Sequence, residues 1–184
     1  PLPGSAGAPV TDARGQVYVA GTANDRSPLP YLYVIDGDRI VPLGPAPTGL
    51  VRLFTWGELL FAVIQTESGG VELVRVNLAG QAVSTEPFLE FPAGFSPTGG
   101  LAYTTQLWAD PIPGTLFFWG TRENAGTLLR AVPGPDGRSA TLSPFAEGFR
   151  RPSGMTVGLD GTLYIADAGA GQLIKIVPTL RQAQ

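Results

Sequence analysis

The 184-residue sequence contains no cysteine and no histidine. Without cysteine the chain cannot form a disulfide, hold an iron–sulfur cluster or use a thiol nucleophile. Without histidine it lacks the commonest metal ligand and the side chain that exchanges protons most easily near neutral pH. Histidine-based catalytic triads and histidine zinc sites therefore cannot be built from this chain alone.

Positive charge and long apolar runs are also scarce. Lysine occurs once, at Lys175, the net charge is -3, and no run of basic residues is present. Nucleic-acid binding needs a basic face against the phosphates, so we exclude nucleic acid as a partner. The longest apolar run, residues 59–64, has the length of a buried strand. A helix that spans a bilayer needs roughly 20 apolar residues, so we expect no transmembrane segment.

Glycine and proline are abundant by contrast. The chain has 25 Gly and 18 Pro, spread among apolar runs that bring the apolar content to 43%. This composition is typical of many short strands joined by turns, with enough apolar surface for a real core. We predict an all-β fold, with residues 1–184 forming one domain or part of one.

One short phrase occurs four times in the sequence. Each copy has a turn glycine, one polar residue and an apolar strand, and the copies begin at Gly15, Gly57, Gly114 and Gly161. The starting points lie 42, 57 and 47 residues apart. A recurrence of turn-plus-strand units near this length predicts a β-propeller.

The repeats divide the chain into about four blade units. We place them at residues 10–47, 48–92, 93–149 and 150–178, with an insertion at 106–113 that lengthens the third. The last unit shows only three of the four strands expected of a blade. Either a strand from the opposite terminus closes the ring, for which residues 2–10 are the candidate, or further blades lie outside this chain. We favour part of a six-bladed ring over a small closed ring.

Two passages in the second half resemble the glucose and sorbosone dehydrogenase family, the soluble six-bladed propellers that use pyrroloquinoline quinone (PQQ). The first consists of Ser96-Pro97-Thr98-Gly99-Gly100-Leu101-Ala102-Tyr103 followed by Pro113-Gly114-Thr115-Leu116-Phe117-Phe118-Trp119-Gly120. The second consists of Phe145-Ala146-Glu147-Gly148-Phe149, Arg151-Pro152-Ser153-Gly154-Met155 and Asp160-Gly161-Thr162-Leu163-Tyr164-Ile165-Ala166-Asp167. The resemblance covers residues 95–178, and the final phrase also resembles NHL-repeat and calcium-dependent lactonase propellers.

The resemblance implies PQQ and calcium as cofactors and a sugar or another alcohol as the substrate. In the resembled enzymes, basic side chains on the late blades hold the carboxylates of the quinone, and the matching positions here are Arg151 and, more loosely, Arg122. Arginine suits this role because its planar guanidinium binds a carboxylate through two hydrogen bonds. The chain departs from the family at Ser153, where a second basic residue is expected, and it has no histidine to act as the base. The catalytic set in this chain is incomplete.

Three further residues are candidates for binding. Asp167 stands where lactonase propellers place a metal carboxylate, although an acid there more often accepts N–H groups of the next turn. Trp119 and Trp108 offer flat faces for a substrate or a partner. Trp119 lies on a predicted strand, which favours packing between blades, whereas Trp108 lies in the 106–113 insertion, where an exposed contact is expected.

Three functions remain open at this point. The first is a PQQ-dependent dehydrogenase of sugars or alcohols. The second is a non-catalytic propeller that binds a protein partner as a scaffold subunit of an extracytoplasmic assembly, and the third is a calcium-dependent lactonase. We expect a periplasmic or secreted protein. The chain begins at Pro1 with no initiator Met, and a lost signal peptide would be consistent with export, although the absence of such a segment is not itself evidence for it.

Overall fold

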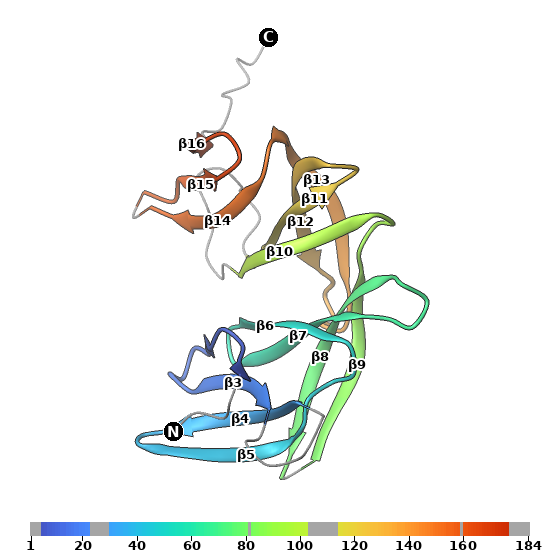
Figure 1. The fold of residues 1–184 in the computed structure, drawn as a ribbon, viewed down its shortest axis with the longest axis vertical. Helices are drawn as coiled ribbons and strands as arrows, with labels where there is room; N and C mark the ends of the chain where they lie inside the picture. Colours follow the sequence, from blue (N-terminus) through green and yellow to red (C-terminus); the bar gives the residue numbers. More distant parts are fainter. Residues whose placement is uncertain (1–4, 23–29, 81, 103–113, 159, 177–184) are drawn as a thin grey trace. The chain divides into compact units, whose positions relative to one another are not determined.

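The computed structural model is all-β (Figure 1), which confirms the predicted fold class. It describes residues 5–22, 30–80, 82–102, 114–158 and 160–176. Across these ranges no helix is long and apolar enough to cross a membrane. The chain divides into two compact units, Pro1–Ala93 and Gly94–Gln184, and each is described by itself.

The first unit contains two antiparallel sheets. The first sheet consists of β1 (Ser5–Ala6), β2 (Val10–Thr11), β3 (Val17–Thr22), β4 (Pro30–Asp36) and β5 (Arg39–Pro45). The second sheet consists of β6 (Leu50–Trp56), β7 (Leu59–Gln65), β8 (Val71–Ala79) and β9 (Ala82–Glu90). Both β1 and β2 pair with β3, so together they are the split first strand of their own sheet. In the described part of the segment 2–10, which was the candidate for a closing strand, β1 and β2 pair with β3 of their own sheet instead.

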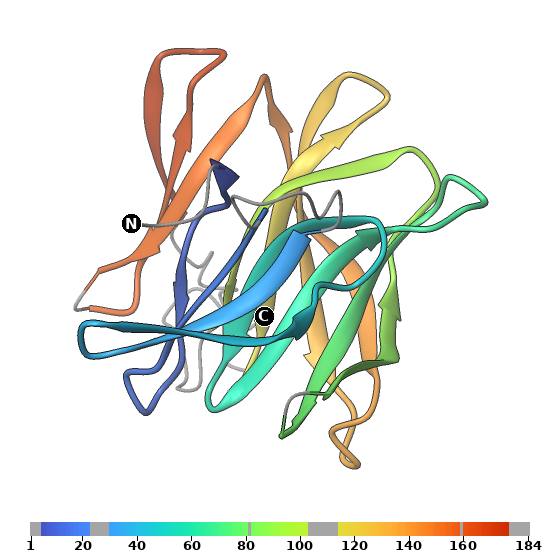
Figure 2. The same cartoon turned by 60° about the horizontal axis from the view of Figure 1, so that its bottom comes forward.

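The second unit also contains two antiparallel sheets. The third sheet consists of β10 (Phe95–Ala102), β11 (Leu116–Arg122), β12 (Ala125–Pro133) and β13 (Ala140–Phe149). The fourth sheet consists of β14 (Pro152–Val157), β15 (Leu163–Asp167) and β16 (Gln172–Ile176). Successive strands lie side by side in chain order in each sheet (Figure 2), except that β1 and β2 of the first sheet both lie beside β3. This meander is the architecture of a propeller blade.

The four repeated glycines all stand in the turn before the second strand of a sheet. Gly15, Gly57, Gly114 and Gly161 have φ angles of 83°, 60°, 74° and 74°. Glycine adopts this left-handed conformation without the steric penalty that a Cβ would bring. The sequence repeat therefore reflects one backbone requirement that recurs at the same place in each blade.

The strand register shows a second repeat that spans neighbouring strands. The second strand of each sheet carries an aromatic residue. The residue two positions after this aromatic residue pairs with a leucine of the third strand. The aromatic residues are Tyr18, Phe61, Phe117 and Tyr164, and the leucines are Leu32, Leu73, Leu128 and Leu173. The first three leucines are completely buried, whereas Leu173 is 71% exposed.

Each unit has an apolar core between its two sheets. In the first unit, Tyr18 and Leu32 pack with Leu53, Leu60 and further residues of the second sheet. Hydrogen bonds also join these sheets, from the Ala13 N–H to the Gly57 carbonyl at 2.8 Å and from the Thr55 hydroxyl to the Thr11 carbonyl at 2.8 Å. The sheets of this unit are thus joined by both apolar packing and polar contacts.

The core of the second unit is built in the same way. Phe117, Trp119 and Leu128 of the third sheet pack against Leu163 and Ile165 of the fourth. The Thr98 hydroxyl of β10 donates to the Pro152 carbonyl of β14 at 3.2 Å. Neighbouring blades are therefore sealed mainly by side chains of their second and third strands.

Candidate functional site

Asp12 is a buried carboxylate in the turn between β2 and β3. Its Oδ1 accepts the N–H groups of Arg14 and Gln16, both at 2.9 Å, and its Oδ2 accepts the Tyr18 hydroxyl at 3.3 Å. Burial alone raises the pKa of Asp12, but these hydrogen bonds and the Arg14 charge outweigh it and lower the pKa below its usual value. Burial and the adjacent Asp12 charge raise the pKa of Tyr18. The turn is therefore held by an ionised carboxylate.

Asp167 plays the same part at the end of β15. Its Oδ2 accepts the Arg150 N–H at 2.7 Å, and its Oδ1 accepts the N–H groups of Arg151, Gly169 and Ala170 at 2.8, 3.1 and 3.3 Å. Burial tends to raise the pKa of Asp167, and these four donors lower it below its usual value. The side chain thus ties the segment entering β14 to the turn after β15, as expected for an acid that accepts backbone N–H groups. Its assignment as a metal ligand stays a prediction.

The described ranges contain no cluster of carboxylates. No group of three or more Asp or Glu residues is placed there to hold a metal ion. Asp160 belongs to a turn, where its Oδ1 accepts the Thr162 N–H at 3.0 Å. The hydrogen bonds from Thr162 lower the pKa of Asp160. Asp160 therefore stabilises the Asp160-Gly161 turn.

The two arginines suggested as quinone ligands lie at strand ends. Arg122 is the exposed last residue of β11, opposite Phe95 of β10. Arg151 is exposed just before β14, and its backbone N–H is the group bound to Asp167. The Ser153 hydroxyl donates to the Ala166 carbonyl at 3.2 Å. The role of Arg122 and Arg151 as cofactor ligands stays a prediction.

Trp119 lies inside the core of the second unit. Its side chain is 7% exposed, and it packs with residues of both sheets. The indole lies against Gly99, where a Cβ would overlap the ring. This agrees with the expectation that Trp119 packs between blades, and it leaves the indole face unavailable to a ligand. Trp108 lies outside the described residues.

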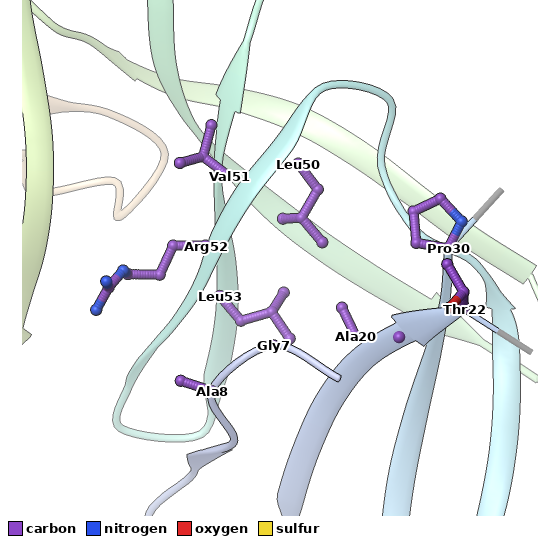
Figure 3. A pocket seen from close by; sticks show the side chains of 10 residues that line it. Gly7, Ala8, Ala20, Thr22, Pro30, Leu50, Val51, Arg52 and Leu53 are labelled. Atoms are coloured by element: carbon purple, nitrogen blue, oxygen red, sulfur yellow. The ribbon is translucent and has the colours of Figure 1, made fainter. Parts of the chain in front are cut away.

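A cavity of about 250 Å³ opens between the two sheets of the first unit. Gly7, Ala8 and Ala20 line it from the first sheet, and Leu50, Arg52 and Leu53 line it from β6. Figure 3 shows Leu50 and Leu53 directed toward Ala20, whereas the guanidinium of Arg52 is directed away from the cavity. The cavity therefore has a mixed lining, with the apolar side chains of Leu50, Leu53 and Ala20 beside Thr22 and glycine backbone.

A β-bulge shapes the margin of this cavity. In the pairing of β6 with β7, Leu50 lies opposite Ile64 and Arg52 lies opposite Val63, so Val51 is an extra residue without a partner. Bulges redirect side chains and are common beside functional sites. Val51 is 56% exposed as a result. An exposed apolar side chain and an exposed guanidinium therefore stand together at the cavity.

Sequence reasoning did not find this cavity or the role of Asp12. The lining residues come from segments about 40 positions apart and share no local pattern. Asp12 could have been recognised, since it stands three residues before the turn glycine of the first repeat. An acid at such a place commonly accepts the N–H groups of its own turn.

A comparison with solved structures finds TolB from Acinetobacter baumannii, itself a β-propeller. The TM-score is 0.56, the sequence identity is 14%, and the match covers 95% of this chain and 44% of the TolB chain. The fold is a β-propeller. At this identity the likeness shows the fold alone, and the chain spans less than half the length of the TolB chain that it matches. No family model matches the propeller described here, and no curated protein matches it in sequence.

Proposed function

We propose that this chain is a non-catalytic β-propeller that binds a protein partner in an extracytoplasmic assembly. The observation that carries the proposal is the cavity beside β6, which we infer receives an apolar side chain of the partner. Leu50, Leu53 and Ala20 provide the apolar part of its lining, and Val51 extends this surface outward. A partner's apolar residue would bury its side chain there, as anchor residues do at protein interfaces.

The size of the cavity favours a side chain over a free small molecule. Its volume of about 250 Å³ lies below the roughly 300–1,000 Å³ that is usual for pockets of drug-sized ligands. The exposed Arg52 guanidinium, which is directed away from the cavity, provides hydrogen-bond donors for a carboxylate of the partner on the surrounding surface. The expected partner segment therefore has an apolar residue next to an acidic one.

The contacts of the two buried carboxylates, Asp12 and Asp167, also support a non-catalytic function. Asp12 and Asp167 each accept several backbone N–H groups of their own turns. A general acid or base needs a side chain that reaches the reacting group of a substrate. Both of these side chains instead hold the backbone of the scaffold.

The location rests on fold likeness. The TolB neighbour is a periplasmic protein. We extend this location to the present chain as part of the proposal, together with the sequence-based expectation of export. Fractionation of the source cells tests it, and recovery in the cytoplasmic fraction would contradict it.

A photo-crosslinking experiment tests the binding site. A benzoylphenylalanine placed at Val51 in the source cells should give a discrete protein adduct on illumination. The matched position is Val41, 39% exposed on β5 against 56% for Val51, and it should give no such adduct. The adduct should be lost with Arg52→Glu and retained with Arg138→Glu, which changes an exposed arginine of the second unit. Equal adducts at both valines, or no effect of Arg52→Glu, would overturn the proposal.

The dehydrogenase and lactonase hypotheses are tested in parallel. The chain is mixed with PQQ and calcium, and aldose-dependent dye reduction is measured beside hydrolysis of a lactone. We expect neither activity. Dye reduction that is lost with Arg151→Ala would restore the dehydrogenase assignment, and lactone hydrolysis that is lost with a chelator would restore the lactonase assignment.

A further inference from the structure

The outer edge of β16 differs from the corresponding edge of the other blades. The third strands β4, β8 and β12 are each paired on their outer side with a fourth strand, β5, β9 or β13. Within residues 160–176 and the other described ranges, β16 pairs only with β15. Among these residues the outer edge of β16 is therefore unpaired, and backbone groups at such an edge can pair with another strand.

The three fourth strands share one local design. Each has a bulge directly after a proline, so that one extra residue lies between two paired positions. The prolines are Pro42, Pro87 and Pro144, and the extra residues are Leu43, Phe88 and Phe145. Proline is tolerated at a bulge on an edge strand, where its missing N–H breaks no ladder bond.

The proline and the bulge have a fixed register against the repeated leucine. In the second sheet, Pro87 lies opposite Val74, the residue after Leu73, and Leu89 lies opposite Leu73 itself. In the third sheet, Pro144 lies opposite Leu129, the residue after Leu128. The register of the first sheet is the same.

The bulged residue packs on the repeated aromatic residue of the second strand. The Phe88 and Phe61 ring centroids are 4.9 Å apart, and those of Phe145 and Phe117 are 5.1 Å apart, both edge to face. Arg130 of the third strand lies over the Phe145 ring at 5.8 Å. An aromatic ring, a basic side chain and a leucine thus form the surface that receives the bulged residue.

The fourth blade carries this receiving surface. Tyr164 is its aromatic residue, Lys175 lies opposite it on β16, and Leu173 is two residues before Lys175. The Lys175 ammonium lies 5.8 Å from the centre of the Tyr164 ring. Leu173 is 71% exposed, whereas the matching leucines are 0% exposed.

We infer that the outer edge of β16 docks, in antiparallel pairing, an extended segment of a partner protein that carries an acidic residue followed by Pro-Phe. The proline lies opposite Ile174, the phenylalanine forms the bulge over Tyr164, and the acidic residue lies opposite Lys175. The template for the acidic residue is Glu86, which precedes Pro87 and lies opposite the basic residue of β8. Strand addition of this kind gains affinity from backbone hydrogen bonds and specificity from alternate side chains. The inference rests on the proposed function only in taking the partner to be a protein.

The test uses the whole 184-residue chain and a labelled peptide with the sequence of residues 84–90, Ser-Thr-Glu-Pro-Phe-Leu-Glu. Fluorescence anisotropy should show saturable binding. A peptide with alanine in place of phenylalanine should bind at least about tenfold more weakly, as expected for loss of an aromatic anchor. Leu173→Asp should weaken binding similarly without lowering the melting temperature, because this side chain is largely exposed.

A charge exchange provides the decisive control. Lys175→Glu should weaken binding of the peptide, and a peptide with lysine in place of the first glutamate should restore it. Arg138→Glu, the matched change at an exposed turn, should leave both affinities unchanged. Absence of saturable binding, or binding that is insensitive to both Leu173→Asp and Lys175→Glu, would overturn the inference.

The same assay separates this inference from the proposed function. Arg52→Glu should abolish the crosslink at Val51 and leave peptide binding unchanged, since Arg52 belongs to the first unit. Peptide binding without a crosslink at Val51 would contradict the proposed cavity and support the β16 edge. A crosslink at Val51 without peptide binding would contradict the β16 edge and support the cavity.

Discussion

Replacing the repeated leucines by alanine provides a direct test of the blade design. Leu128 and Leu173 occupy the same place in adjacent sheets of one unit, yet Leu128 is 0% exposed and Leu173 is 71% exposed. Their mutation removes the same atoms from the same backbone context. The difference in the free energy of unfolding therefore measures what covers each side chain.

The structure sets the expected magnitudes. Leu128→Ala deletes three buried carbon atoms, which costs about 2.4 kcal/mol at about 0.8 kcal/mol per buried carbon. The space left lies among Phe117 and Trp119, whose rigid rings collapse poorly, so a cavity term brings the total to about 3–4 kcal/mol. Less than a third of the Leu173 surface is covered, and its loss should cost about 0.7 kcal/mol or less.

Urea unfolding followed by far-ultraviolet circular dichroism, with thermal melts beside it, provides the measurement. For a chain of this length each kcal/mol lowers the melting temperature by about 2–4 °C, so Leu128→Ala should lower it by about 6–16 °C. The matched Leu73→Ala tests the same expectation in the first unit. If Leu173→Ala costs as much as Leu128→Ala, Leu173 is covered in the free protein and the blade comparison is refuted.

Three further predictions follow from the turns. The pKa values of Asp12 and Asp167 lie below the ordinary 3.8 because hydrogen bonds from backbone N–H groups outweigh the effect of burial. Ionisation of the two carboxylates therefore stabilises the folded state above pH 3.8, and this stability is lost as the pH falls through their pKa values in the folded protein. The urea midpoint should thus be flat from pH 7 to about 5 and should fall below about pH 4, and a fall that is as steep in Asp167→Asn would contradict the role of that carboxylate. Gly49→Ala places a Cβ against the Gln65 carbonyl at a φ of 72°, whereas the Cβ of Gly57→Ala meets open space at a φ of 60°. Gly57→Ala should therefore lower the free energy of unfolding by roughly 1–2 kcal/mol, the cost of the left-handed backbone, and Gly49→Ala should lower it by more. Equal melting temperatures of the two variants would refute this. A chelator should leave the melting temperature unchanged, and a drop would instead support Asp167 as a metal ligand.

Local patterns were sufficient for the fold. Gly15, Gly57, Gly114 and Gly161 mark positions where the backbone needs a positive φ, a requirement that acts within a few residues and is therefore visible in the sequence. Three strands were also predicted for the last unit, and its described residues form β14, β15 and β16. The placement of Trp119 also followed locally, since an aromatic residue within an apolar strand has a buried sheet face available to it.

The candidate site depended on contacts that no local pattern contains. The cavity joins Ala20 to Leu53 across two sheets, and its margin depends on a bulge at Val51 that no sequence pattern predicts. The sequence of residues 2–10, rich in Gly and Pro, does not indicate which strand they pair with, and only the structure shows that β1 and β2 pair with β3.

The sequence by itself determined where the chain turns and which residues form strands, because φ preferences and the alternation of apolar residues act over short distances. Tertiary structure alone decided which strand edges pair and which side chains are covered. Leu32, Leu73, Leu128 and Leu173 occupy equivalent positions in their blades, yet three are buried and one is exposed. Leu32 and Leu128 are buried against residues of the neighbouring sheet, and those residues are distant along the chain.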